Sequence, residues 1–151
     1  MKKLTFIIVL FLSSYGCSTE NIYGSGDCFI PEVAVNETIN TALPQYYHLQ
    51  TIGNYSFLPG GNNGIFLVHN FDGMFYALER TCPYQSDNEC SVIQIDSTSL
   101  QLKCGAYADT GFVKCCDSRY LLDGLLIQGP SICNLKRYRV NASGSTLFIN
   151  N

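Results

Sequence analysis

Histidine is scarce in this chain, with only two in 151 residues, His48 and His69. A nucleophile–histidine–acid triad needs a histidine beside its nucleophile. The sequence also lacks a Gly-x-Ser-x-Gly elbow, which would present a nucleophilic serine. His48 lies in an aromatic stretch and His69 follows an apolar run, so both are expected to be structural or surface residues. The sequence offers no catalytic constellation and favours a protein that is not an enzyme.

Long hydrophobic runs are absent apart from one at the N-terminus. Lys2 and Lys3 precede the apolar segment 4–12. This segment is too short to span a bilayer as a stable helix and is typical of a signal peptide. Any attachment to a membrane would therefore have to come from a lipid.

The apolar run is followed by Ser13-Ser14-Tyr15-Gly16-Cys17, which resembles the lipobox of bacterial lipoproteins. The resemblance implies cleavage after Gly16 and a diacylglycerol on Cys17. We expect residues 1–16 to be a lipoprotein signal peptide and the polar residues 17–27 to be a flexible tether. Residues 28–151 then suit a single domain with one core.

Basic residues are few and scattered. Nine lysines and arginines face twelve acidic residues, for a formal net charge of −3. Loss of Lys2 and Lys3 with the signal peptide makes the mature chain more acidic still. Because the chain has no basic patch to contact phosphates, we expect no nucleic-acid partner.

The mature part of the chain shows short β-prone segments broken by turns. The glycine-rich turn 60–64 leads into the apolar run 65–68, and the turn 71–73 leads into a return strand at 74–78. Further candidate strands are 46–52, 91–95, 100–103, 111–114, 119–122, 125–128, 135–140 and 146–149. A helical period is only weak, near 33–43. Many short strands at close spacing favour an all-β sandwich or barrel.

Eight cysteines in an exported chain point to an oxidising compartment. If Cys17 carries a lipid, seven thiols remain, and an odd number leaves at least one unpaired within the chain. The seven are Cys28, Cys82, Cys90, Cys104, Cys115, Cys116 and Cys133. Cys28 lies near the mature N-terminus and could pair with any of the others.

An ordered series of motifs runs through the second half of the chain. It comprises Thr81-Cys82-Pro83-Tyr84, Cys90, Cys115-Cys116-Asp117-Ser118-Arg119-Tyr120, Asp123-Gly124, Gln128-Gly129-Pro130, Leu135 and Tyr138-Arg139-Val140. Over residues 60–151 this series resembles the Rieske domain, in particular a Rieske-like lipoprotein type of the Bacteroidetes lineage. The resemblance implies a Rieske-like antiparallel β-sandwich or barrel, with a small loop subdomain that carries the cysteine motifs.

The iron ligands of the family are not all present. A Rieske [2Fe-2S] cluster takes two thiolates on one iron and two imidazoles on the other. By the resemblance, Cys82 stands at the first cysteine ligand and Tyr84 at the first histidine. Cys116 stands at the second histidine and Val113 at the second cysteine. Cys104 could instead be placed on this second motif, but with Cys116 there the later motif residues fall into place, and residues 104–112 become an insertion.

The resemblance matches Cys115 to an extra cysteine that braces the two ligand loops through a disulfide, with Cys90 as a candidate partner. Cys82, Cys90, Cys115 and Cys116 also give the count for a four-cysteine metal site. Zinc knuckles space their cysteines two to four residues apart, whereas the adjacent Cys115 and Cys116 point to opposite faces of an extended strand. We therefore prefer two disulfides that join Cys115 and Cys116 to Cys82 and Cys90, in a pairing left open. A metal site that uses Cys82 and Cys116 and redox-active thiols at Cys115 and Cys116 are the alternatives.

These features favour a cell-envelope lipoprotein, periplasmic or surface facing, whose Rieske-like domain no longer binds the family's cluster. Its role would be that of a binding or structural module, with an unidentified envelope protein as partner. The alternative is an electron-transfer protein that binds a [2Fe-2S] cluster through atypical ligands.

Overall fold

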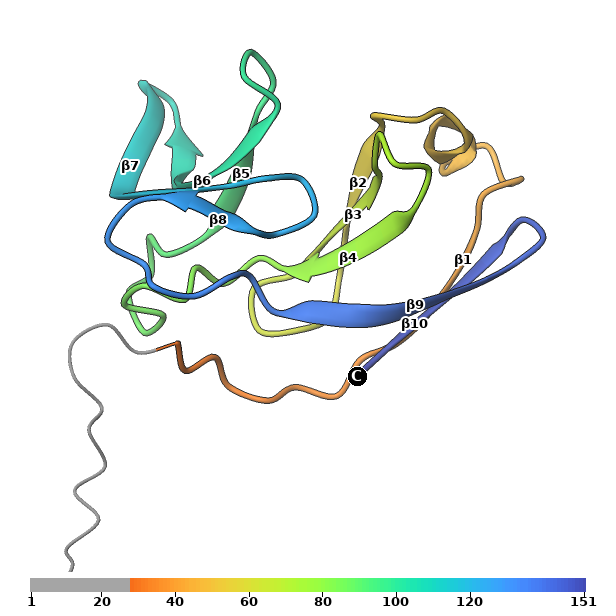
Figure 1. The fold of residues 1–151 in the computed structure, drawn as a ribbon, viewed down its shortest axis with the longest axis horizontal. Helices are drawn as coiled ribbons and strands as arrows, with labels where there is room; N and C mark the ends of the chain where they lie inside the picture. Colours follow the sequence, from red (N-terminus) through yellow and green to blue (C-terminus); the bar gives the residue numbers. More distant parts are fainter. Residues whose placement is uncertain (1–27) are drawn as a thin grey trace, which may run out of the picture.

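The computed structural model describes residues 28–151. Residues 1–27, which contain the predicted signal peptide, the predicted tether and Cys17, lie outside the described part of the chain. The described residues form ten strands and one short 3-10 helix, and every pairing between strands is antiparallel (Figure 1). The prediction of an all-β fold is confirmed.

The larger sheet has six strands, in the order β1–β10–β9–β4–β3–β2. Their bounds are β1 Asn36–Asn40, β2 Tyr55–Leu58, β3 Ile65–His69, β4 Phe75–Glu79, β9 Arg137–Ser143 and β10 Thr146–Asn150. Alternate residues of β3 face two different core clusters: Ile65 and Leu67 lie in one, and Phe66 and Val68 in the other. Burial of both faces explains why this strand is a continuous apolar run in the sequence.

The smaller sheet has four strands, in the order β5–β6–β7–β8, and lies to one side of the larger sheet in Figure 1. Its strands are β5 Ile93–Asp96, β6 Gln101–Ala108, β7 Gly111–Tyr120 and β8 Leu126–Gln128. One core cluster joins the two sheets, because Phe66 and Leu78 of the larger sheet pack with Leu102 and Tyr120 of the smaller one. The smaller sheet carries Cys104 in β6 and Cys115 and Cys116 in β7, whereas Cys82 and Cys90 lie in the segment between β4 and β5.

Two segments differ from their local sequence patterns. Residues 46–52 were expected to form a strand, but Tyr47–Gln50 form the 3-10 helix η1, in which Leu49 alone is buried. The weak helical period near 33–43 instead covers the strand β1, which pairs with β10 along its whole length. In both segments the tertiary contacts override local propensity: Leu49 fills a core position on a turn, and β1 completes the edge of a sheet.

A buried carboxylate holds the loop that leads to the first cysteine motif. Glu79, at the end of β4, accepts hydrogen bonds from the backbone N–H of Asn62 (2.8 Å), Asn63 (3.0 Å) and Thr81 (2.9 Å) and from the hydroxyl of Tyr138 (2.6 Å). Burial opposes the ionisation of Glu79, but the hydrogen bonds outweigh it and hold its pKa below the ordinary value. The ionised side chain therefore ties three segments together in front of Cys82.

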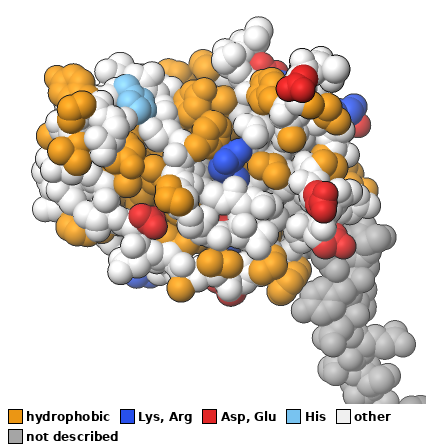
Figure 2. Space-filling model, turned by 180° about the vertical axis from the view of Figure 1, so that it is seen from behind, with side chains coloured by type: hydrophobic (Ala, Val, Ile, Leu, Met, Phe, Trp, Pro, Cys, Tyr) orange, Lys and Arg blue, Asp and Glu red, His pale blue; other side chains and the backbone are white. Residues whose placement is uncertain are grey.

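Several large apolar side chains are exposed at the surface of the described residues. Ile132 is 76% exposed and Phe71 is 61% exposed. On the face shown in Figure 2, hydrophobic side chains lie in several groups and charged side chains are widely spaced. No helix in the described part of the chain is long and apolar enough to cross a membrane.

Candidate functional site

Three thiols from separate segments meet beside the smaller sheet. Cys82 follows β4, Cys104 lies in β6 and Cys116 lies in β7. Their Sγ atoms all lie within 4.8 Å of one another, and those of Cys82 and Cys116 are 3.9 Å apart. None of the three is in a disulfide. The fold thus assembles a compact triangle of free thiols.

A large bulge in β7 makes this arrangement possible. The pairing of β6 with β7 shifts between Lys103 and Gly105, so that Cys104 alone lies opposite residues 115–118. A bulge redirects the side chains that it carries. Gly105 is required at this point, because its φ is +150° and a Cβ there would collide with the carbonyl oxygen of Val113.

The bulge sends its two cysteines in different directions. Cys115 is bonded to Cys90, a pairing that the sequence left open. Cys116 turns toward Cys82 and Cys104 instead. The sequence favours two disulfides among Cys82, Cys90, Cys115 and Cys116 in an open pairing, but only the one between Cys90 and Cys115 is formed, and Cys82 and Cys116 are free. The sulfur atoms of Cys82 and Cys116 belong to the group of three, and their 3.9 Å separation is far longer than an S–S bond of about 2.05 Å.

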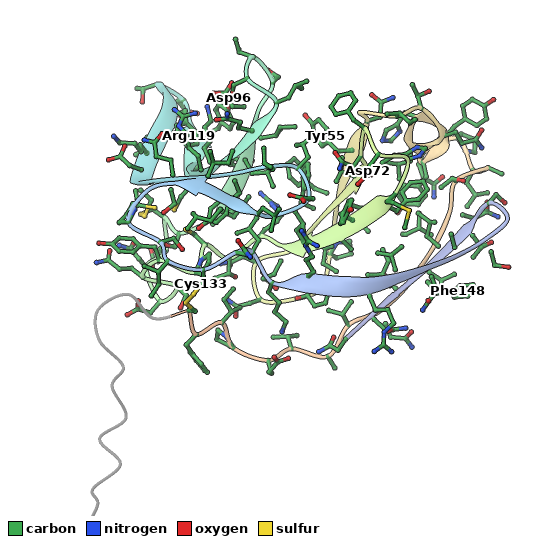
Figure 3. The ribbon with its side chains drawn as sticks, viewed as in Figure 1. Tyr55, Asp72, Asp96, Arg119, Cys133 and Phe148 are labelled. Carbon is green, nitrogen blue, oxygen red and sulfur yellow. A yellow bond between two sulfur atoms is a disulfide. The ribbon has the colours of Figure 1, made fainter. Side chains whose placement is uncertain are left out.

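The loop after β8 lies against the bulge. Gly129 has a φ of +120° and lies so close to Ser118 that a Cβ would collide with the backbone there. The N–H of Ser131 donates to the hydroxyl of Ser118 (3.1 Å). The same loop is fixed to the start of the described chain by the disulfide between Cys133 and Cys28; Figure 3 labels Cys133.

The three thiols differ in their tendency to ionise. A hydrogen bond from the thiol of Cys104 is the main cause that lowers the pKa of Cys82 to about 6, and the backbone N–H of Tyr84 and the hydroxyl of Tyr120 add to it. Interaction with the thiolate of Cys82, together with burial, raises the pKa of Cys104. Burial and the same thiolate raise the pKa of Tyr120. Among these groups, Cys82 therefore ionises most readily, while the pKa values of Cys104 and Tyr120 are raised.

A cavity of about 130 Å³ opens onto this group. It is lined by Lys103, Cys104, Phe112, Lys114, Cys116, Asp117, Ser118 and Arg119. Its cations are partly paired: Lys103 and Arg119 lie 3.6 and 3.9 Å from Asp96, and Lys114 lies 2.6 Å from Asp117. Figure 3 shows Arg119 and Asp96 near each other on the smaller sheet. Because three cationic side chains lie beside only two carboxylates, the side chains around the mouth of the cavity carry a net charge of +1.

The site residues inferred from the family resemblance are only partly brought together. Cys82 and Cys116 meet as expected, and Tyr84 packs, half-buried, against the core cluster that contains Cys82. Val113, assigned to the second cysteine ligand, is 50% exposed and pairs with Ala106 away from the thiols.

Cys104 is the site residue that sequence reasoning set aside. Residues 104–112 were taken as an insertion, whereas in the structure residues 105–114 form the paired tip of the β6–β7 hairpin beyond the site. If the insertion is taken to begin after Cys104 rather than at it, Cys104 stays within the second cysteine motif. The adjacent Gly105, a position typical of a bulge, was the local signal for that boundary.

The donor set does not match that of a Rieske cluster, which needs two thiolates and two imidazoles. His48 lies in η1, where it contacts the Tyr55 carbonyl and Ser56, and His69 ends β3 and contacts the Leu49 carbonyl. Both belong to the larger sheet and its helix, away from the cysteine motifs (Figure 1). The described residues therefore provide three thiols and no imidazole at this site.

No protein-family model matches the chain, and no curated protein matches it either. Among solved structures, the cyanobacterial plasma membrane Rieske protein PetC3 from Synechocystis is similar, with 20% identity and a TM-score of 0.44 over 63% of this chain and 82% of that one. The ferredoxin of carbazole 1,9a-dioxygenase from Nocardioides aromaticivorans is also similar, with 16% identity and a TM-score of 0.46 over 78% of this chain and 97% of that one. Both likenesses concern the fold alone.

Proposed function

We propose that this chain is a lipid-anchored cell-envelope protein of the Rieske-like lipoprotein type, whose domain binds no Rieske cluster and acts as a binding or structural module. The observation that carries the proposal is the donor set. Where two imidazoles would be needed, the described residues offer a third thiol, Cys104, and no histidine.

The disulfide between Cys90 and Cys115 supports this proposal, because it joins the two cysteine loops without a metal. Cys90 and Cys115 connect the first cysteine loop to the bulge of β7, at a sequence separation of 25. In the chain-entropy model, closing a loop of that length stabilises the fold by about 3.5 kcal/mol. The loops therefore keep their positions without iron.

The lipid anchor is proposed from Cys17 and the residues before it. The described chain begins at Cys28, which is bonded to Cys133 in the loop that lies against the bulge. A tether of residues 17–27 would thus leave the domain at the end that carries the thiols, with a reach of at most about 40 Å when fully extended. The partner would be an envelope protein or another ligand within that distance of the membrane.

Iron analysis tests the loss of the cluster. We expect protein purified from the envelope without oxygen to contain no stoichiometric iron or acid-labile sulfide, and to show no iron–sulfur absorption in the visible range. A Rieske-type ferredoxin carried through the same purification is the control for cluster survival. If this protein holds iron and sulfide in stoichiometric amounts, the alternative of an electron carrier with atypical ligands replaces the proposal.

Lipidation is tested at Cys17. We expect the wild-type protein to incorporate labelled fatty acid and to fractionate with membranes, and Cys17→Ala to incorporate none, because the thiol is the point of attachment. Ser18→Ala, at the neighbouring position, is the matched control and should be labelled like the wild type. Equal labelling of Cys17→Ala, or a wild-type N-terminus that carries no lipid, would refute the anchor.

A further inference from the structure

The triangle of sulfur atoms has the size of a ligand set for one metal ion. A metal–sulfur bond of about 2.3 Å places two sulfur ligands of one ion about 3.8–4.0 Å apart, in tetrahedral or trigonal geometry. The Sγ atoms of Cys82 and Cys116 are 3.9 Å apart, and that of Cys104 is within 4.8 Å of both. Small side-chain movements would therefore bring all three onto a single ion. A two-iron cluster would need its ligands spread over two metals.

The number and kind of donors select the ion. Thiolates favour soft ions such as Cu⁺ and Zn²⁺. A structural zinc ion completes a tetrahedron with four protein ligands, whereas the described residues offer three. Three thiolates are sufficient for Cu⁺, which readily takes low coordination numbers. We propose that Cys82, Cys104 and Cys116 bind one cuprous ion. This inference rests on the proposed function in one respect, namely that no [2Fe-2S] cluster occupies the thiols.

Burial and access agree with a held ion. Cys82 and Cys104 are fully buried, so an ion between them would be shielded from water. Cys116 is only half-buried and, with Cys104, lines the cavity of about 130 Å³ that opens from the surface. This cavity provides a route by which an ion could reach the thiols, as a metal site requires.

The surrounding charges also favour the complex. Binding of Cu⁺ releases the protons of the protonated thiols to the solvent, so that each sulfur binds as a thiolate. Three thiolates and one Cu⁺ carry a net charge of −2, which is costly to bury without compensation. Lys103, Lys114 and Arg119 line the cavity and exceed by one the two carboxylates that pair with them, Asp96 and Asp117. In addition, the hydroxyl of Tyr120 lies 3.7 Å from Sγ of Cys82 and is placed to donate to it.

The experiment uses the mature lipoprotein in detergent, purified without oxygen with both disulfides intact. Alkylation and mass mapping should find three free thiols, at Cys82, Cys104 and Cys116. Titration with Cu⁺ against a coloured cuprous chelator should then show one equivalent bound, with an ultraviolet thiolate-to-copper band. X-ray absorption at the copper edge should report three sulfur ligands.

Single substitutions test whether the bound Cu⁺ is held by the three thiols. We expect Cys116→Ser to weaken Cu⁺ binding by more than about 100-fold, the upper end of what loss of a supporting second-shell group costs. Cys116 is preferred for this test over Cys104 because it is only half-buried, so its serine variant should fold, which thermal unfolding will verify. Met74→Leu removes an exposed thioether sulfur outside the site. The Cu⁺ affinity of this variant should lie within about twofold of that of the wild type.

Three results would overturn the copper site: a folded protein with three free thiols that binds no Cu⁺, a Cys116→Ser variant with wild-type affinity, or a bound zinc ion that Cu⁺ does not displace. A single free thiol would mean that an oxidant has joined two of the three cysteines, and would overturn it too. All four leave the proposed function standing if iron and sulfide are absent. Stoichiometric iron and sulfide would overturn both.

Discussion

Replacing Glu79 by glutamine is expected to lower the free energy of unfolding by about 3 kcal/mol at neutral pH, the upper range for a hydrogen bond to a charged group. The carboxylate is fully buried and accepts hydrogen bonds from the N–H groups of Asn62, Asn63 and Thr81 and from the hydroxyls of Thr81 and Tyr138. The NH2 group of a glutamine is itself a donor, so it could not accept the hydrogen bonds that these groups offer, and buried donors would be left unpaired. Urea unfolding of both proteins at pH 7 measures the difference.

The pH dependence of this difference in unfolding free energy distinguishes the effect of the Glu79 charge from that of the changed side-chain shape. The pKa of Glu79 is lower in the folded state than in the unfolded chain, so its stabilisation is fully present above the unfolded value of about 4.3 and is lost as the pH falls through the folded value. The difference in unfolding free energy between wild type and Glu79→Gln should therefore become smaller in acid. Glu89→Gln, at an exposed position, is the control and should change stability by less than about 0.5 kcal/mol. A gap that is constant from pH 7 to pH 3 would contradict the role of the charge.

Removal of the disulfide between Cys28 and Cys133 is expected to have the other large effect. The double variant Cys28→Ser/Cys133→Ser should lose about 3–5 kcal/mol of unfolding free energy, because the cross-link spans a sequence separation of 105 and its loss frees a long loop in the unfolded chain. Both cysteines are changed together so that no new thiol can attack the remaining disulfide. Chemical unfolding under non-reducing conditions measures the loss.

The second disulfide is the internal comparison. Cys90→Ser/Cys115→Ser opens a loop with a sequence separation of only 25, so in the same model its cost should be smaller by about 1.3 kcal/mol. If this variant is the less stable of the two, loop entropy does not dominate. Local packing around the bulge of β7 would then be the larger contribution.

Local sequence patterns predicted much of the β fold. The apolar run 65–68 became β3, and the turn at 71–73 became the hairpin that joins it to β4. The alternation of side chains along a strand also predicted that Cys115 and Cys116 would diverge, as they do. These features depend on neighbours within a few residues, which is the range over which propensity and periodicity act.

Other features could not be predicted because they depend on register between distant segments. The 3-10 turn at Tyr47–Gln50 exists because Leu49 fills a core position made by later strands. Cys104 lies beside Cys82 and Cys116, in a stretch where the register of β6 and β7 shifts between Lys103 and Gly105. A shift of this kind leaves only a glycine in the sequence as its trace.

The sequence by itself determined the all-β class, the scarcity of histidine and the presence of six cysteines within residues 82–133. Only the tertiary structure decided which thiols are bonded and which are free. Cys90 and Cys115 are joined, while Cys82, Cys104 and Cys116 converge within 4.8 Å. The physical reason is that thiol chemistry depends on distances of a few ångströms between sulfur atoms, and strand pairing and a bulge set those distances across gaps in sequence that no local pattern spans.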